Sequence, residues 1–600
     1  MHGSFTTRPE LRGRFGTVTT THWLASAAGM RMLDRGGNAF DAAVATGFVL
    51  QVVEPHLNGP GGEFPAIFHH AATGRTRVLC AQGTSPRRAS IAHYRAEGLE
   101  MIPGNGLLAA VVPGAFDGWM LMLRDYGSLS LRDVLEPAVH YAGEGHPVLP
   151  RVSATVAGLD DFFREYWPSS HRVWLPGGQA PAPWALFRNP DLAATWTRLL
   201  TEAEAEGPDR ITQIEAARRI FSRGFVARAI VDFIAAGPVM DESGAARRGI
   251  LGADDLAGWQ ASYEEPQWLD YHGWRVHKTG PWGQGPAFLQ ALRLLEGQDI
   301  GSLDPTGAGF VHLVTEALKL AQADRDAYFG DPDGAEVPMA ALLSDDYSAM
   351  RRSLIGPRAS FDFRPGVLPG FQDQIAICRQ VLAPVLGKGA VYEPTMAHLS
   401  EQEARGKGDT CHLDVIDQWG NVVSATPSGG WLQSSPIVPG LGFALSSRAQ
   451  MFWLAPGLPS SLAPGMRPRT TLTPSLATHP DGRIFAFGTP GGDQQDQWQL
   501  PFFLRVAHHG MGLQQALDAP LFHNMNAPSS FAPRTSQPGR LVVESSFPET
   551  TLTELRARGH DLEVVAPYDL GRLTAALREA DGMIRSGATA ASMQAYALIR

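Results

Sequence analysis

The sequence predicts an α+β protein in which helices come first and strands dominate after Thr410. Apolar residues recur at helical spacing from the N-terminus to about residue 350. Directly after a polar stretch at 400–409, the hydrophobic period becomes that of paired strands. Of the 600 residues, 44% are hydrophobic and 18% charged, so the chain can bury a large core.

Three helices are predicted most clearly. The first covers 25–35 and ends at Gly36. Asn38 can cap the second, over 39–54, which is apolar nearly all round and therefore buried. The third is amphipathic and covers 311–329, where a Gly-Asp-Pro run ends it.

The strands are predicted as two pairs. Residues 400–409 (SEQEARGKGD) are polar and charged, which indicates an exposed segment. After Thr410, CHLDVID and VVSAT form the first pair, with Gly420 and Asn421 in the turn. TLTPSLATH and RIFAFGT form the second pair around PDG.

Composition excludes several classes of protein. Asp and Glu (60) outnumber Lys and Arg (50) and no basic stripe occurs, so no nucleic-acid partner is expected. The three cysteines are far apart, which favours a reducing compartment over a disulfide framework or zinc cluster. No segment has the character of a signal peptide or membrane span, so we expect a cytoplasmic protein without membrane partners. We expect no metal, because the sequence contains no HExxH or CxxC motif. We expect no cofactor, because GPGGEF at 59–64 lacks the strand, helix and acidic partner of a dinucleotide site.

The stretch GKGDTCHLDVIDQWGN carries the strongest functional signal, although by itself it predicts only an ordinary strand. It resembles the maturation site of gamma-glutamyltransferases, and further segments match that family in order and spacing. These segments are LASAAGMRMLDRGGNAFDAAVA, VVPGAFDGW, EALKLAQADRDAYFGDPD, RPRTTLTPSL and GTPGGDQQ. The resemblance implies the four-layer αββα sandwich of N-terminal-nucleophile hydrolases. It also implies autocatalytic cleavage between Asp409 and Thr410, giving chains 1–409 and 410–600 that share one core as a heterodimer.

The resemblance also assigns roles to individual residues. Thr410 would be the nucleophile, with its freed α-amino group as the base that a threonine hydroxyl requires. Ser428 would support the nucleophile. Gly491 and Gly492 would place backbone N–H groups in an oxyanion hole, where glycine lets the backbone approach closely; without the resemblance they indicate an ordinary turn. The hydroxyls of Thr470 and Thr471 would hold a substrate carboxylate.

Four positions depart from the family pattern. Gln82 replaces the arginine that clamps the substrate carboxylate, and Gly430 replaces an asparagine near the nucleophile. Arg448 and Met451 replace the glutamine and acidic residue that receive the substrate ammonium. We expect an ammonium beside Arg448 to find no acidic partner and to be repelled, whereas a carboxylate would be attracted. The alternative is that Arg448 is only a solvated or ion-paired arginine. This arginine resembles the cephalosporin acylase-like branch of the family.

The sequence therefore predicts a hydrolase that cleaves an amide of a small substrate bearing a carboxylate, of glutaryl or gamma-glutamyl type. Two alternatives remain open at this stage. A relative with the same nucleophile could hydrolyse a carbon–carbon bond in a biosynthetic pathway. An uncleaved, catalytically silent relative could act as a binding protein.

Overall fold

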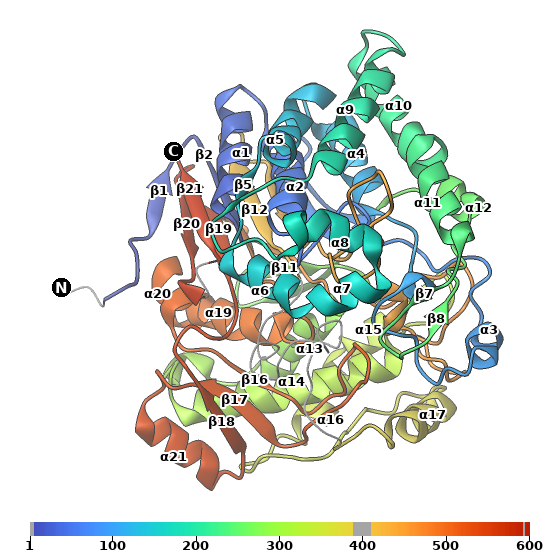
Figure 1. The fold of residues 1–600 in the computed structure, drawn as a ribbon. Coiled ribbons are helices and arrows are strands. Elements are labelled where there is room, and N and C mark those ends of the chain that lie inside the picture. The colour runs from blue at the N-terminus through green and yellow to red at the C-terminus, as the bar shows by residue number, and fades with distance from the viewer. Residues whose placement is uncertain (1–4, 388–409, 592–593) are drawn as a thin grey trace.

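Two seven-stranded sheets lie face to face between two layers of helices (Figure 1). A computed structural model describes residues 5–387, 410–591 and 594–600. One sheet, called sheet A, has the order β1 (Leu11–Gly13), β20 (Ile584–Ala588), β19 (Thr574–Arg578), β15 (Ile484–Gly488), β14 (Ser475–Thr478), β11 (Trp274–Lys278) and β10 (Gln267–Tyr271). Sheet B has the order β21 (Tyr596–Ile599), β2 (Gly16–Thr20), β12 (Leu413–Asp417), β13 (Val422–Ala425), β3 (Phe64–His70), β4 (Arg75–Ala81) and β9 (Ser262–Glu264).

Each sheet has its own helical layer. The layer on sheet B, in the upper part of Figure 1, contains α1 (Trp23–Asp34), α2 (Ala39–Val53), α4 (Ala115–Tyr126), α5 (Leu131–Gly143), α9 (Pro190–Glu204), α10 (Arg210–Arg223) and α11 (Phe225–Ala236). The layer on sheet A contains α13 (Gly285–Leu295), α14 (Ala308–Tyr328), α19 (Gln495–His509) and α20 (Leu513–Asp518).

Alternating side chains in the central strands explain the four layers. On β12, Leu413 and Val415 pack in the core beneath the helices, whereas Ile416 packs against the other sheet. On β15, Phe487 faces the helices and Ala486 faces sheet B. Because successive side chains of a strand point to opposite faces, one apolar gap lies between the sheets and one core beneath each helical layer. The αββα sandwich implied by the resemblance is confirmed.

The three predicted helices are present with small shifts at their ends. They are α1, α2 and α14. Asn38 caps α2 and forms a capping box with Asp41, and every residue of α2 is buried, as its apolar composition predicts. Both predicted strand pairs are present, as β12–β13 and β14–β15. Gly420 adopts φ +90° in the first turn, a conformation that glycine tolerates best.

Smaller elements surround the sandwich. A three-stranded sheet of β16 (Phe522–Asn524), β17 (Arg540–Glu544) and β18 (Asp561–Val565) lies with α21 (Glu549–Ala557) near the lower end in Figure 1. The short helices are α3 (Ile91–Ala96), α6 (Pro150–Gly158), α7 (Asp160–Tyr166), α8 (Pro168–Trp174), α12 (Ala253–Gly258), α15 (Met339–Leu342), α16 (Asp345–Arg352) and α17 (Gln372–Leu382). Two strand pairs are β5 (His146–Pro147) with β6 (Leu186–Phe187), and β7 (Val239–Met240) with β8 (Ala246–Arg247).

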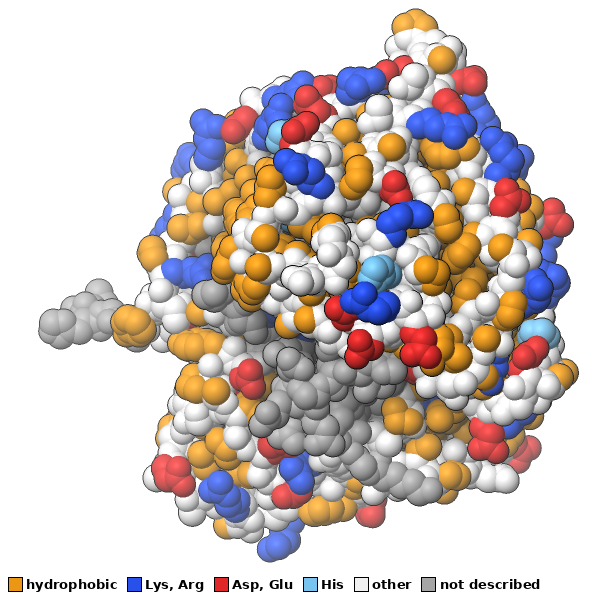
Figure 2. Space-filling model, in the orientation of Figure 1, with side chains coloured by type: hydrophobic (Ala, Val, Ile, Leu, Met, Phe, Trp, Pro, Cys, Tyr) orange, Lys and Arg blue, Asp and Glu red, His pale blue; other side chains and the backbone are white. Residues whose placement is uncertain are grey.

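Acidic and basic side chains are interspersed over the face shown in Figure 2. Among the described residues, no helix combines the length and apolar character needed to cross a membrane.

Both sheets combine strands from before and after position 410. In sheet B, β12 lies between β2 and β13, and β13 in turn pairs with β3. In sheet A, β14 pairs with β11, and β20 pairs with β1. The two halves of the chain therefore build each sheet together.

Candidate functional site

The predicted nucleophile lies in a row of side chains across the end of sheet B. Thr410 pairs with Ser428, and Ser428 pairs with Glu63, as extensions of β12, β13 and β3. Two backbone hydrogen bonds of 2.9 and 3.0 Å join Glu63 to Ser428. Residues in register on neighbouring strands point to the same face. These three share the face of Ile416 and Ile67, so they line the mouth of the gap between the sheets.

Polar contacts connect this row to Arg448. The Thr410 and Ser428 hydroxyl oxygens lie 3.3 Å apart. Arg448 Nη2 donates to Ser428 Oγ at 2.8 Å, and Arg448 Nε donates to Glu63 Oε1 at 2.6 Å. Thr410 is 3% exposed, and Arg448 and Glu63 are buried more deeply still. The site is therefore a shielded polar cluster in which the Ser428 hydroxyl contacts both Thr410 and the guanidinium.

Arg448 is ion-paired, the alternative that the sequence left open, and the expectation that no acidic group lies near it is wrong. Its guanidinium forms a buried ion pair with Glu63, which lies 385 positions earlier in the chain. Burial raises the pKa of the Glu63 carboxyl, and the neighbouring Arg448 charge and Ser446 hydroxyl oppose that rise. Arginine carries five N–H donors, so the pair leaves terminal N–H groups of Arg448 for a further acceptor. Glu63, which directly follows the GPGG run, thus belongs to the site, a role that a phosphate-loop motif does not indicate.

Glycines allow the two loops beside this pair to touch. A Cβ at Gly62 would lie 2.2 Å from the Ser428 carbonyl oxygen, and one at Gly429 would lie 2.4 Å from Glu63 Oε1. Gly430 adopts φ +63°, and a Cβ there would lie 2.7 Å from the Gly62 nitrogen. A side chain cannot fit at Gly430 in this arrangement, which explains why no asparagine occupies the position.

Aromatic and thioether groups surround the guanidinium. Arg448 begins a short 3₁₀ helix, Arg448–Met451. Its Nη1 lies 3.8 Å from Met451 Sδ, and its Cζ lies 5.2 Å from the Trp431 ring centre and 6.0 Å from that of Phe531. Trp431, Met451 and Phe531 form one buried cluster. Such rings favour a cation, so Arg448 is held on its apolar sides as well as by Glu63.

The predicted oxyanion glycines follow β15 at the same end of the sandwich. Gly488, the last residue of β15, packs so closely on His412 that a Cβ would lie 2.2 Å from the imidazole. Gly491 has φ +125°, which requires glycine. The Gly492 carbonyl accepts a 3.3 Å hydrogen bond from Gln284 Nε2. Thr410 precedes β12, and the two glycines follow β15. The ends of these two central strands are in contact through His412 and Gly488.

The remaining predicted residues are buried near these glycines and strand ends. The Thr470 backbone N–H donates to the Trp282 carbonyl at 2.8 Å, and its hydroxyl accepts from the Leu472 N–H. Thr471 Oγ1 has no hydrogen-bond partner among the described residues. Gln82 directly follows β4 and is fully buried. Asp409, the other half of the predicted cleavage site, lies outside the described residues.

An ionic network joins the glycine loop to the Arg448 cluster. Asp493, next to Gly492, forms an ion pair with Arg325 and accepts from the Ser530 N–H at 2.8 Å and its hydroxyl at 2.6 Å. Arg469 Nη2 donates to Ser530 Oγ at 2.8 Å. Ser530 precedes Phe531, which packs on Arg448. The loop around Ser530 thus links the two parts of the site.

Cys411 is a poor alternative nucleophile despite its position next to Thr410. Its side chain packs in the core beneath the helices, on the opposite face of the strand from the row. Its thiol lies 3.1 Å from Glu54 Oε2 and 3.2 Å from Asn58 Nδ2. Burial, followed by the Glu54 charge, raises the pKa of the thiol well above its usual range. Because the thiolate is the reactive form, Cys411 is inert.

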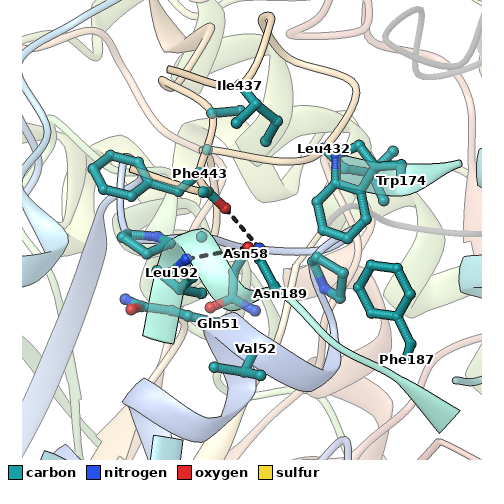
Figure 3. A pocket seen from close by; sticks show the side chains of 16 residues that line it. Gln51, Val52, Asn58, Trp174, Phe187, Asn189, Leu192, Leu432, Ile437 and Phe443 are labelled. Carbon is teal, nitrogen blue, oxygen red and sulfur yellow. Dashed lines mark hydrogen bonds between the residues drawn. The ribbon is translucent and has the colours of Figure 1, made fainter. Parts of the chain in front are cut away.

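A small cavity is lined in part by Gly430 (Figure 3). It has room for about one water molecule, about 10 Å³. Trp174 and Phe187 line one side, and the amide of Gln51 has no hydrogen-bond partner on either atom. This cavity suits an ordered water and is too small for a substrate.

One group of buried side chains within the described residues could in principle hold a metal ion. His312, Glu316 and His560 offer ligand atoms within 4.8 Å of one another. However, Glu316 already accepts from Lys319 Nζ at 2.8 Å and Arg364 Nη2 at 3.2 Å. Two cations beside the carboxylate would repel a divalent ion, so we assign no metal to this group.

The fold and the site together define the class of N-terminal-nucleophile hydrolases: an αββα sandwich with a hydroxyl at the start of a central strand and glycines at the end of a facing one. Comparisons with known proteins identify the family. The model of the family described as Gamma-glutamyltranspeptidase matches residues 25–597. The chain belongs to the gamma-glutamyltranspeptidase family and is a hydrolase.

Individual relatives resemble the chain over nearly its whole length. The acylase ACY 1 proenzyme of Pseudomonas sp. (strain SE83) is 32% identical over 590 residues, covering 96% of this chain and 92% of the relative. The solved structure of LmbA2991HD is 50% identical with a TM-score of 0.91, covering 100% of both chains. The cephalosporin acylase from Bacillus halodurans is 27% identical with a TM-score of 0.82, covering 100% of this chain and 98% of the other.

Proposed function

We propose that this protein is a self-processing amidohydrolase in which Thr410 is the N-terminal nucleophile of an acyl-enzyme mechanism. The observation that supports this most is the row of Thr410, Ser428 and Glu63, with Arg448 bound to the last two. The names of two similar proteins, an acylase proenzyme and a cephalosporin acylase, agree with amide cleavage after processing.

Maturation comes first in this mechanism. The Thr410 hydroxyl attacks the Asp409 carbonyl, the acyl group moves from nitrogen to oxygen, and water hydrolyses the ester. The products are chains 1–409 and 410–600, and Thr410 gains a free amine with an ordinary pKa of about 8. We propose that the two chains remain together as a heterodimer, and a cytoplasmic location remains our prediction.

Substrate hydrolysis repeats the same chemistry on an external amide. The hydroxyl attacks the substrate carbonyl and gives its proton to the α-amino group. The Gly491 and Gly492 N–H groups stabilise the oxyanion, a contribution of about 2.7–4 kcal/mol for one donor. The α-ammonium then protonates the departing amine, and water hydrolyses the resulting ester to release the acid and restore Thr410.

The position of Arg448 supports a substrate with a carboxylate close to the reacting carbonyl. Thr410 Oγ1 and Arg448 Nη2 both contact the Ser428 hydroxyl, at 3.3 and 2.8 Å. The distance from Arg448 Nη2 to Thr410 Oγ1 therefore cannot exceed the sum of these two hydrogen-bond lengths. A short acyl chain fits this separation, whereas an extended glutaryl or gamma-glutamyl chain would have to fold back.

Intact-mass analysis of the wild type beside Thr410→Ala tests this proposal. The wild type should separate into two chains from a 64.7 kDa precursor, with a new N-terminus at Thr410, and the variant should remain whole. A single uncleaved wild-type chain would favour the silent binding protein instead. Cleavage without hydrolysis of any malonyl, succinyl, glutaryl or gamma-glutamyl anilide would favour the carbon–carbon hydrolase.

A further inference from the structure

Two buried oxygen atoms near the mouth of the sheet gap lack hydrogen-bond donors. They are Gln82 Oε1 and Glu63 Oε2, on side chains that are fully buried; neither accepts a hydrogen bond of ordinary geometry from a described residue, although the Ser446 hydroxyl is near enough to the Glu63 carboxyl to oppose the rise in its pKa. The other atoms of both groups are engaged. Gln82 Nε2 donates to the Gly83 carbonyl at 3.2 Å, and Glu63 Oε1 accepts from Arg448 Nε at 2.6 Å.

The two side chains occupy neighbouring positions of the same row. Phe64 pairs with Ala81 at the end of the β3–β4 ladder, so Glu63 and Gln82 are the next residues outward on these two neighbouring strands. Cys80, two residues before Gln82, packs in the gap between the sheets, so Gln82 faces that gap as Glu63 does. Were the register to continue by one residue, the Cβ atoms of Glu63 and Gln82 would lie about 4.5–5.5 Å apart. The row thus runs from Thr410 through Ser428 and Glu63 to Gln82.

The orientation of the Gln82 amide follows from its surroundings. The Gly83 carbonyl can only accept, so the amide nitrogen must face it and the oxygen must point elsewhere. The backbone here cannot relax easily, because a Cβ at Gly83 would lie 1.7 Å from the Val112 carbonyl oxygen. Gln82 Oε1 is therefore a fixed acceptor rather than one of two interchangeable atoms.

Buried polar atoms in folded proteins are nearly always hydrogen-bonded, because an unpaired one is costly. No protein donor is near Gln82 Oε1 among the described residues, and Glu63 Oε2 has only the Ser446 hydroxyl in its vicinity besides Arg448. Both accept hydrogen bonds; Glu63 contacts the arginine that we propose holds the substrate carboxylate, and Gln82 follows the strand next to that of Glu63. A substrate group that donates hydrogen bonds would satisfy both at once.

We propose that Glu63 and Gln82 form a subsite for a hydrogen-bond donor of the substrate, carried close to the carboxylate that Arg448 binds. The placement of that carboxylate rests on the proposed function. The acyl group of the substrate therefore bears an ammonium or a neutral donor in addition to its carboxylate. The subsite comes entirely from the part of the chain before residue 410.

Three small dicarboxylates of nearly equal shape test the subsite by isothermal titration of the processed enzyme. Aspartate presents an ammonium, malate a hydroxyl donor, and methylsuccinate a methyl group at the same carbon. Each is measured as both enantiomers. We expect at least one enantiomer of aspartate or malate to bind tenfold or more tightly than methylsuccinate, and the aspartate-to-malate ratio tells whether the donor is charged.

Two matched variants assign the effect. Gln82→Met removes the acceptor and keeps the length, and it should reduce the tenfold preference to less than threefold. Gln51→Met is the control, because Gln51 also has an unpartnered buried amide but lines the small cavity beside Gly430 instead. It should leave the preference unchanged. Processing into two chains and an unchanged melting temperature show that each variant is folded, and Gln82→Glu, which keeps the acceptor, should retain a preference for aspartate.

Equal binding of all three ligands to the wild type would overturn the proposal and indicate that ordered water occupies the subsite. A preference that survives in Gln82→Met would overturn it as well. Because binding is measured without turnover, failure to hydrolyse any amide would count against the proposed function and not against this subsite.

Discussion

Replacement of Glu63 by leucine should destabilise the protein through the arginine that it leaves behind. Glu63 and Arg448 form an ion pair in which both side chains are almost completely buried. Removing one partner of such a pair typically costs about 3–5 kcal/mol, because the remaining charge is buried without compensation. With an unfolding entropy of about 2.1 cal/mol/K per residue over 600 residues, this corresponds to a decrease in melting temperature of about 2–4 °C.

The double variant Glu63→Leu/Arg448→Met separates this cause from simple loss of packing. Replacing both members of a buried pair by apolar residues is often neutral or stabilising. The double variant should therefore recover most of the lost melting temperature in a thermal denaturation assay. Glu265→Leu provides the control, since its ion pair with Arg75 is exposed and worth about 0–1 kcal/mol. A single variant as stable as the wild type, or a double variant no better than the single, would refute the reasoning.

Two further perturbations test other parts of the structure. Gly488→Ala should displace His412, since the new Cβ would lie 2.2 Å from the ring. The variant should slow processing and turnover at least tenfold. The control is Gly356→Ala, where nothing lies within 4 Å of the new Cβ, and it should slow neither. Equal rates in the two variants would contradict the close packing. Burial lowers the pKa of His523, which accepts from Trp498 Nε1, from 6.5 to about 3. The unfolded chain therefore binds more protons than the folded one between these values, and this histidine should lower stability by about 1.4 kcal/mol for each pH unit below 6.5. His523→Gln should flatten the acid side of the melting-temperature profile, and an unchanged profile would show that His523 titrates normally in the folded protein.

The local elements were predictable because each carries its own signal. The α2 helix has a cap at Asn38 and an unbroken apolar run, and the β12–β13 turn has Gly420 where a positive φ is needed. These features depend on residues close together in the chain, so sequence spacing suffices to identify them. The four-layer arrangement came from the family resemblance instead, because periodicity does not specify how two sheets stack.

The partner of Arg448 could not be predicted in the same way. Glu63 is 385 positions away, and the two meet only because β3, β13 and the loop before Arg448 adopt one particular register. A useful signal was present in the GPGG run before Glu63, whose glycines allow backbone contact with the loop at 428–430. An acidic residue directly after such a run therefore indicates a buried ion-pair partner as readily as part of a phosphate loop.

Because each sheet combines strands from both segments, the order of folding and cleavage matters. If the bond before Thr410 is cut, the segment 410–600 keeps β12 and β13 but owns neither β2 nor β3, the strands on either side of them. Once separated, each product would expose long sheet edges that are prone to pair with the wrong chain. Refolding would then require an encounter between two molecules, whereas the intact precursor needs none. The cut protein therefore depends on a fold that was established before cleavage, and its persistence is set by how slowly it unfolds rather than by its ability to fold again.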